Sequence, residues 1–296
     1  MIAYPAVVRW VVMIGAVAGC GRVAFEPVTD GALAAVDAPV DETRCTWSAP
    51  VAIAELNTPA SEAEPALSPD GAVLVFTSDR LGDDDLFVSV RQDDGWTAPS
   101  VVASLQSGAD DQGPAWSADG TQLYFTSYRS GPLRVYASSY DGGTFGPPVL
   151  VPGLESLTEV TSPTVRRDDR EMFYSSRVPP SAIERATRAS PTDAWTPRGP
   201  VPELVASRDR GYPGLSPTGH VLYFEQTEPG VGFHIARVAR STLDEPFGAP
   251  ERVTEIAGGR NDGDPEVSAD GTQLLLSSDR ARAGDYDLYL ATRTCP

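Results

Sequence analysis

The stretch PALSPDGAVLVFTSDR, residues 65–80, decides the fold that we expect for this chain. Its Asp70-Gly71 pair stands between a short apolar segment and a run of β-branched and aromatic residues. An Asp-Gly pair in this setting is a strong hairpin signal, because glycine adopts a positive φ at little cost. The run that follows has the composition of a β-strand. Similar stretches recur along the chain, so this hairpin belongs to a repeating unit.

Two columns of residues show how often the unit repeats. A proline opens each copy and an aromatic residue stands near its end, and both columns advance by 49, 49, 50 and 52 residues. The prolines are Pro65, Pro114, Pro163, Pro213 and Pro265. The aromatic residues are Trp47, Trp96, Phe145, Trp195 and Phe247. Because the two columns share one set of spacings, they predict five copies of the unit.

Each copy has room for four short strands. The hairpin supplies two, a third strand such as residues 86–90 follows an acidic loop, and a fourth begins at the aromatic column, as in residues 96–102. Four antiparallel strands in about 50 residues are typical of a β-propeller blade. We therefore expect an all-β fold, a five-bladed β-propeller with four antiparallel strands per blade, over residues 45–296.

The two ends of this region predict how the ring closes. Residues 45–50 match a fourth strand and residues 288–295 match a third, so the N-terminal strand should pair within the last blade. When both ends are aligned with the first complete blade, Cys45 and Cys295 fall on neighbouring positions of a hairpin. Export to an oxidising compartment would let them form a disulfide. A bond that closes a loop of about 250 residues contributes roughly 5 kcal/mol by chain entropy.

The repeats also resemble a known family. A Pro-x-x-Ser-Pro-Asp-Gly turn, a strand ending in Thr/Ser-Ser-Asp-Arg, an acidic loop and Leu-Tyr resemble the WD40-like repeats of the TolB type. The stretches that carry the resemblance are residues 65–80, 114–129 and 265–289. In the third copy Arg166 and Arg167 replace the Ser-Pro of the turn, and in the fourth Glu225 and Gln226 replace Ser-Asp. The resemblance covers residues 45–295 and implies the propeller fold, but much less about function.

The N-terminal residues predict where the protein is located in the cell. Residues 1–19 carry one cation before an apolar run that is too short to span a membrane, which is typical of a signal peptide. They end in Val-Ala-Gly before Cys20, which resembles a lipobox with Cys20 as the lipid-attachment residue; an ordinary signal peptide is the alternative. Gly21 favours the outer membrane. Residues 20–44 lack periodicity and predict a flexible tether with a span of roughly 27 Å.

Charge excludes several classes of function. The chain has 41 acidic and 23 basic residues, a net charge of -18, and all its basic residues other than two histidines are arginine. A basic face for nucleic acid is therefore excluded. The absence of lysine excludes a Walker-type phosphate site and Schiff-base chemistry. Two histidines exclude a histidine-rich metal site, so we expect no cofactor and no metal site, with Ca²⁺ at carboxylates the one alternative.

A polar position recurs four residues before each column proline. Its members are Ser61, Asp110, Glu159, Asp209 and Asn261. In a propeller these residues would ring the mouth of the central channel and could bind a cationic ligand, Ca²⁺ or a sugar. Alternatively, they cap strand ends by binding backbone N–H groups. Three of the five are carboxylates, which keeps open a glycan hydrolase that works through an acid and a base.

Taken together, these features predict an outer-membrane lipoprotein of the cell envelope that faces the periplasm or the exterior. We expect a monomer that touches the membrane through its lipid alone. Its propeller would be a non-catalytic binding or assembly module for an envelope protein or a glycan. A glycan-active hydrolase and a Ca²⁺-dependent carbohydrate-binding propeller are the alternatives.

Overall fold

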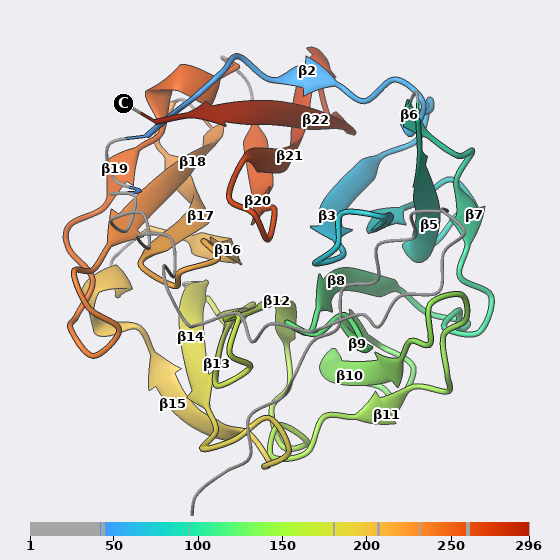
Figure 1. Cartoon of the computed structure of the whole chain (residues 1–296), viewed down its shortest axis with the longest axis horizontal. Helices are drawn as coiled ribbons and strands as arrows, with labels where there is room; N and C mark the ends of the chain where they lie inside the picture. The colour runs from blue at the N-terminus through green and yellow to red at the C-terminus, as the bar shows by residue number, and fades with distance from the viewer. Residues whose placement is uncertain are drawn as a thin grey trace, which may run out of the picture. The chain divides into compact units, whose positions relative to one another are not determined.

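The computed structural model describes residue 42 and residues 45–93, 95–179, 181–205, 208–230, 232–258 and 261–295. The predicted signal peptide, Cys20 and all of the predicted tether except Glu42 lie outside these ranges. The described residues form five antiparallel sheets that follow one another around a central axis (Figure 1). The predicted fold class, an all-β propeller with five blades, is confirmed. No helix in the described ranges has the length and apolar character needed to cross a membrane.

The blades follow the chain in order. The first contains β3 (Glu62–Leu67), β4 (Val73–Ser78), β5 (Asp85–Gln92), β6 (Gly95–Trp96) and β7 (Ser100–Val101). The second contains β8 (Asp111–Trp116), β9 (Gln122–Ser127), β10 (Arg134–Ser139) and β11 (Val149–Leu150). The third contains β12 (Val160–Val165), β13 (Glu171–Ser176), β14 (Ala182–Thr187) and β15 (Thr196–Pro200). The fourth contains β16 (Arg210–Leu215), β17 (Val221–Glu228), β18 (Gly232–Ala239) and β19 (Glu251–Arg252).

Both ends of the chain build the fifth blade. It contains β20 (Asp262–Val267), β21 (Gln273–Arg282) and β22 (Asp285–Thr294), and both β1 (Thr46–Trp47) and β2 (Val51–Ala52) pair with β22 (Figure 1). A disulfide joins Cys45 to Cys295, with a Cα–Cα distance of 4.2 Å. The predicted closure by the N-terminal strand and the predicted disulfide are therefore confirmed.

The turn predicted from the Asp-Gly motif forms as expected. In the first blade Asp70 accepts a hydrogen bond from the Ser68 hydroxyl at 2.5 Å and one from the Ala72 amide at 3.0 Å. The Ser68 hydroxyl in turn accepts from the Val73 amide at 2.8 Å, and Gly71 has a φ of 72°. These bonds satisfy the backbone of the tight turn, which is why serine, aspartate and glycine recur at these positions.

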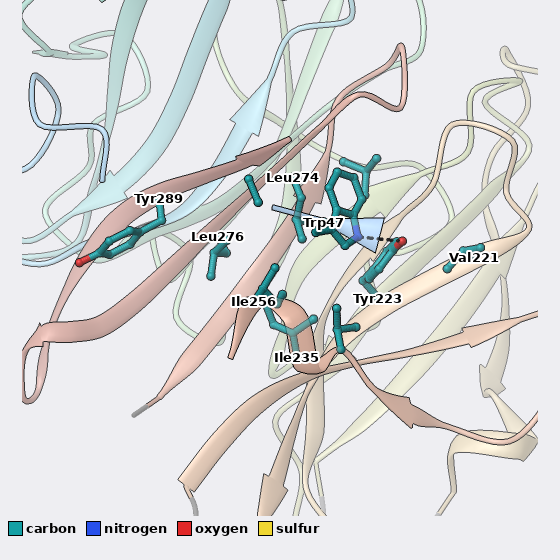
Figure 2. Close-up of a cluster of buried hydrophobic side chains, with 11 residues drawn as sticks. Trp47, Val221, Tyr223, Ile235, Ile256, Leu274, Leu276 and Tyr289 are labelled. Carbon is teal, nitrogen blue, oxygen red and sulfur yellow. Dashed lines mark hydrogen bonds between the residues drawn. The ribbon is translucent and has the colours of Figure 1, made fainter. Parts of the chain in front are cut away.

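The apolar core lies between neighbouring blades. Trp47, from the N-terminal strand, packs edge-on against Tyr223 of the fourth blade, with a centroid distance of 6.1 Å. Its indole N–H also donates to the Tyr223 hydroxyl at 3.3 Å (Figure 2). Leu274 and Leu276 of β21 belong to the same cluster and are fully buried. The aromatic column thus connects blades to one another, in addition to marking their fourth strands.

In the first, second and fifth blades, an arginine just after the second strand holds the blade to the loop before it. Arg80 donates to the carboxylate of Glu62 on β3 and to the carbonyl of Leu56, at 2.8 and 3.1 Å. Arg280 makes the same contacts with Asp262 and with the carbonyl of Ile256, at 2.6 and 3.0 Å. The recurrence of this arginine therefore reports a structural role.

Candidate functional site

A kink in the first strand of every blade points one residue at the central axis. In β3 the pairing with β4 shifts register between Ala63 and Ala66, and each of the other first strands shows the same bulge. The residue before the column proline lies in the bulge with a positive φ. These residues are Glu64 (φ 51°), Gly113 (60°), Ser162 (49°), Tyr212 (52°) and Asp264 (50°). A positive φ in a residue other than glycine costs about 1–3 kcal/mol and persists where the surroundings enforce it.

We call these five residues the axial ring. With the column prolines they line a cavity of about 30 Å³ on the axis. A space of that size holds a water molecule or a small ion. Gly113 has no substitute here, because a Cβ atom on it would lie 2.9 Å from the backbone nitrogen of Ser162.

Glu64 connects four blades across the axis. Its carboxylate accepts hydrogen bonds from the Thr77 hydroxyl of its own blade, from the Gly113 amide of the second blade and from the Ser162 hydroxyl of the third, each at 2.8 Å. Its backbone amide donates to the Asp264 carboxylate of the fifth blade at 3.3 Å. The protein's own donors thus occupy both oxygens of this carboxylate.

Two more carboxyl groups, those of Asp264 and Glu225, interact electrostatically with Glu64. Asp264 accepts a hydrogen bond from the Ser277 hydroxyl, and burial together with the charge of Glu64 raises its pKa to about 7. Glu225 occupies the place where the other four second strands carry serine or threonine. Burial and the charges of Asp264 and Glu64 raise the pKa of Glu225 well above its ordinary value. Near neutral pH, part of this cluster is therefore protonated.

Arg177 supplies positive charge to the cluster. Burial opposes its charge, but its interactions with Tyr212 and Glu64 outweigh burial and raise its pKa above the ordinary value. Burial and the three neighbouring carboxylates raise the pKa of the Tyr212 hydroxyl, so Tyr212 remains a neutral hydrogen-bonding group. One arginine facing three carboxyl groups leaves the axis acidic.

The channel mouth lies above this cluster, where the loops between second and third strands meet. Asp84, in the loop between β4 and β5, is half-buried, and its backbone carbonyl accepts from the Asp111 amide at 2.7 Å. Burial and the charges of Glu64, Asp110 and Asp79 raise the pKa of the Asp84 carboxyl to about 6. No described residue donates a hydrogen bond to that carboxylate.

The five residues predicted to ring the mouth lie directly before the first strands. Three of them bind backbone amides at the start of the third strand of the preceding blade. Ser61 accepts from Tyr286 at 3.3 Å, Asp209 from Ser181 at 3.0 Å, and Asn261 from Phe233 at 3.0 Å. These bonds are the strand-end caps that the sequence left open as an alternative.

The side chains of Asp110 and Glu159 form no such cap with a described residue. Their backbone carbonyls accept hydrogen bonds from the Tyr128 and Arg177 amides, at 3.1 and 2.7 Å, a contact that the other three positions share. Asp110 faces Asp84 electrostatically at the mouth. Neither residue lines the axial cavity, and Asp209 does not line it either. Ligand binding by the predicted ring thus remains a prediction.

The arrangement of acidic, cysteine and histidine side chains within the described ranges bears on metal binding. No group of three or more His, Cys, Asp or Glu side chains there is arranged to hold a metal ion. His234 is buried in β18, and burial lowers its pKa, so it stays neutral at physiological pH. His220 follows the turn of the fourth blade, and its backbone amide donates to the Thr218 hydroxyl at 3.3 Å.

The five residues of the axial ring were not predicted from the sequence. Its five members share a position but no chemistry, since they include a glycine, a serine, a tyrosine and two acids. The column prolines were the available signal, because proline restricts the backbone of the residue before it. That restriction does not by itself predict a positive φ.

Comparisons with solved structures show which known fold the chain shares. The putative TolB from Agrobacterium tumefaciens superposes with a TM-score of 0.52 at 21% identity, over 82% of this chain and 80% of that one. The chain has a TolB-like β-propeller fold. The match to TolB from Acinetobacter baumannii, with a TM-score of 0.40 and 16% identity, covers 78% of this chain and 43% of that protein. No protein-family model and no curated protein matches the sequence.

A hydrolase domain is also similar in structure. The catalytic domain of the GH62 α-L-arabinofuranosidase from Coprinopsis cinerea superposes on the TolB-like propeller with a TM-score of 0.59. The two sequences are 11% identical over 85% of this chain and 97% of that one. Similarity at this level shows a shared fold, and a shared propeller supports many unrelated functions.

Proposed function

We propose that this chain is a lipid-anchored protein of the cell envelope whose propeller is a non-catalytic binding module. Its channel mouth would hold a cationic group of an envelope protein or of a glycan. The observation that carries this proposal is the Asp84 carboxyl, which is half-buried among like charges and receives no hydrogen bond from a described residue. A ligand cation placed there would relieve repulsion that Arg177, the one positive charge acting on Asp84 among the described residues, compensates only in part.

The other carboxylates of the cluster indicate that a ligand binds at the channel mouth and not in the cavity beneath it. Glu64 uses both carboxylate oxygens to bind its own protein, and Asp264 is occupied by Ser277 and the Glu64 amide. The cavity measures about 30 Å³, whereas pockets that enclose a small molecule measure about 300 Å³ or more. A ligand would therefore rest on the mouth, where Asp84 and Asp110 face solvent-accessible space.

Proton competition gives this proposal a pH dependence. The Asp84 carboxyl must be ionised to attract a cation, and its pKa is raised to about 6. Binding should therefore weaken as the pH falls from 7 to 5. An ordinary aspartate, with a pKa near 3.9, would remain ionised over that range and would give no such dependence.

A pull-down of envelope extract on the immobilised chain tests the proposal. Asp84→Asn should reduce the recovery of the specific partner about tenfold. Asp193→Asn removes the same charge from the exposed loop between β14 and β15 and serves as the matched control. If Asp84→Asn and the control retain the same proteins and glycans, or if recovery is equal at pH 5 and pH 7, the proposed mouth site is wrong.

A glycan hydrolase is the second candidate. The raised pKa of Asp84 favours it, because a general acid needs a carboxyl that is protonated near the working pH, and the α-L-arabinofuranosidase domain shares the fold. Release of reducing sugar from arabinan or xylan, lost in Asp84→Asn and in Asp110→Asn, Glu159→Gln or Asp209→Asn, would establish it and refute the non-catalytic proposal. We expect no release by the wild-type chain.

A further inference from the structure

One position near the end of the third strand carries an arginine in four blades and a tyrosine in the second blade. The five residues at this position share one backbone contact, in which the amide donates to a carbonyl just after the turn between the first and second strands. They are Arg91, Tyr140, Arg188, Arg240 and Arg293, with donor–acceptor distances between 2.7 and 3.0 Å. Four blades thus place an arginine where the second blade places Tyr140.

The four arginines make the same two contacts, one with an aromatic ring and one with a turn carbonyl. Arg240 stacks over Phe247 with its guanidinium 4.7 Å from the ring centroid, and it donates to the carbonyl of Gly219 in the turn at 2.9 Å. Arg91 stacks over Trp96 at 4.4 Å and donates to the carbonyl of Gly71 at 2.8 Å. Arg188 and Arg293 repeat this pattern. Each guanidinium binds an aromatic face and a turn carbonyl together.

In the second blade the ring of Tyr140 takes the place of the guanidinium against Phe145, and the turn carbonyl loses its donor. Tyr140 stacks on Phe145 with a centroid distance of 4.7 Å and meets Trp116 edge-on at 5.0 Å. Among the described residues, the arginine bonds to turn carbonyls reach Gly71, Asp169, Gly219 and Gly271, and none reaches Gly120, the counterpart of these residues in the second blade. The second blade therefore offers an aromatic surface and a turn carbonyl with no guanidinium of its own.

A groove opens at this place, between the first and second blades. It encloses about 1180 Å³, and Gly120, Tyr140 and Phe145 line its side on the second blade. Val88, Val90 and Val101 of the first blade line its other side. Val90 is 46% exposed, which is high for an aliphatic side chain in a strand. The groove lies at the turns that join first to second strands and thus at the opposite end of the strands from the channel mouth.

Acidic side chains border the groove, and no basic residue lines it. Hydrogen bonds from Ser68 and Ala72 lower the pKa of Asp70. Burial opposes ionisation of Asp119, but hydrogen bonds from Thr121 and Ser117 outweigh it and lower the pKa of Asp119 as well. Asp141, held by Thr144, also has a lowered pKa. These three carboxylates stay ionised at physiological pH, so the groove is apolar with a negative border.

We propose that this groove binds an extended segment of a partner protein in which aliphatic residues alternate with arginine. The aliphatic side chains contact the valines, and an arginine of the partner supplies the guanidinium that the second blade lacks, on the ring of Tyr140 and at the carbonyl of Gly120. Asp119 and Asp141 provide the complementary charge. The four other blades show the same chemistry at this end of the strands, since in each a guanidinium binds an aromatic face and a turn carbonyl together. This docking surface does not depend on the proposed channel-mouth function.

The test uses the full chain and the peptide acetyl-(Val-Arg)₃-amide in calorimetric titration. The peptide should bind, and acetyl-(Val-Gln)₃-amide should bind at least tenfold more weakly. Tyr140→Arg gives the second blade the arginine of the others and should weaken binding of the arginine peptide at least tenfold, whereas Tyr140→Phe should change it less than twofold. Failure of the peptide to bind, or equal binding to wild type and Tyr140→Arg, would overturn the proposal.

A second pair of variants guards against misfolding at position 140. Val90→Asn changes an exposed valine in the groove, and Val149→Asn changes an exposed valine of β11 outside it, at 46% and 58% exposure. Val90→Asn should weaken binding about fivefold and Val149→Asn should leave it unchanged. Asp84→Asn should also leave it unchanged. If Asp84→Asn weakens peptide binding and Val90→Asn does not, the peptide binds at the mouth and the groove proposal is refuted.

Discussion

Removal of the Cys45–Cys295 disulfide should cost the protein a large part of its stability. The bond joins residues 250 positions apart, and the chain-entropy relation gives about 5 kcal/mol for a loop of that length. Without it, the N-terminal segment is held to the last blade by β1 and β2, which are two residues each. The double variant Cys45→Ser/Cys295→Ser should still fold, but with a less stable ring.

Urea unfolding followed by tryptophan fluorescence measures this loss. The emission is the sum over five tryptophans, of which Trp47 is 5% exposed and lies two residues from Cys45 in the closing blade. With a urea dependence of about 3 kcal/mol per molar, a loss of about 5 kcal/mol lowers the midpoint by about 1.7 M. The wild-type chain in dithiothreitol should unfold at the same midpoint as the double variant. A loss below about 1 kcal/mol would refute the reasoning, because strand pairing alone would then be closing the ring.

Three further predictions concern buried charges. Asp262→Asn leaves Arg280 without its ion-pair partner at 2.6 Å and should lower the free energy of unfolding in urea by about 3 kcal/mol. A loss below 1 kcal/mol would contradict the structural role that we assign to this ion pair. Burial raises the pKa of Glu266 to about 8, so stability from its protonated form is present below pH 4.5 and is lost as the pH rises through 8. Glu266→Gln should therefore unfold at higher temperature than wild type at pH 9 and equally at pH 4; equal melting at both would disprove the shift. Glu225→Thr installs the residue type of the other blades and should raise the melting temperature at pH 8 but not at pH 4; a lower temperature at pH 8 would show that Glu225 is needed at the axis.

The sequence predicted those parts of the fold that repetition makes visible. The spacing of the prolines and aromatic residues gave the number of blades, and the unequal ends of the chain gave the closing strand and the bond between Cys45 and Cys295. Each of these features depends on similar residues at equivalent positions. Hairpin chemistry of that kind is local, so it can be recognised without knowing the tertiary structure.

The site was less predictable because it depends on differences between blades. The polar position beginning with Ser61 is regular in sequence, and in three blades it caps strands. The axial residues differ in type, and their place on the axis follows from a bulge whose backbone angle no residue type specifies. The groove depends on Tyr140, which departs from a column of arginines whose spacing is irregular, because the hairpins between third and fourth strands differ in length.

The disulfide also decides how the propeller would respond to tension. A pull on the chain before Cys45 would, in its absence, peel β1 and β2 away from β22 one residue pair at a time. With the bond in place, the load passes directly to β22, which is paired along most of its length with β21. The sheet would then have to rupture as a whole before the chain could be drawn out. When force acts on the N-terminal side of the propeller, the disulfide would thus reinforce the fold at the residue where the force is applied.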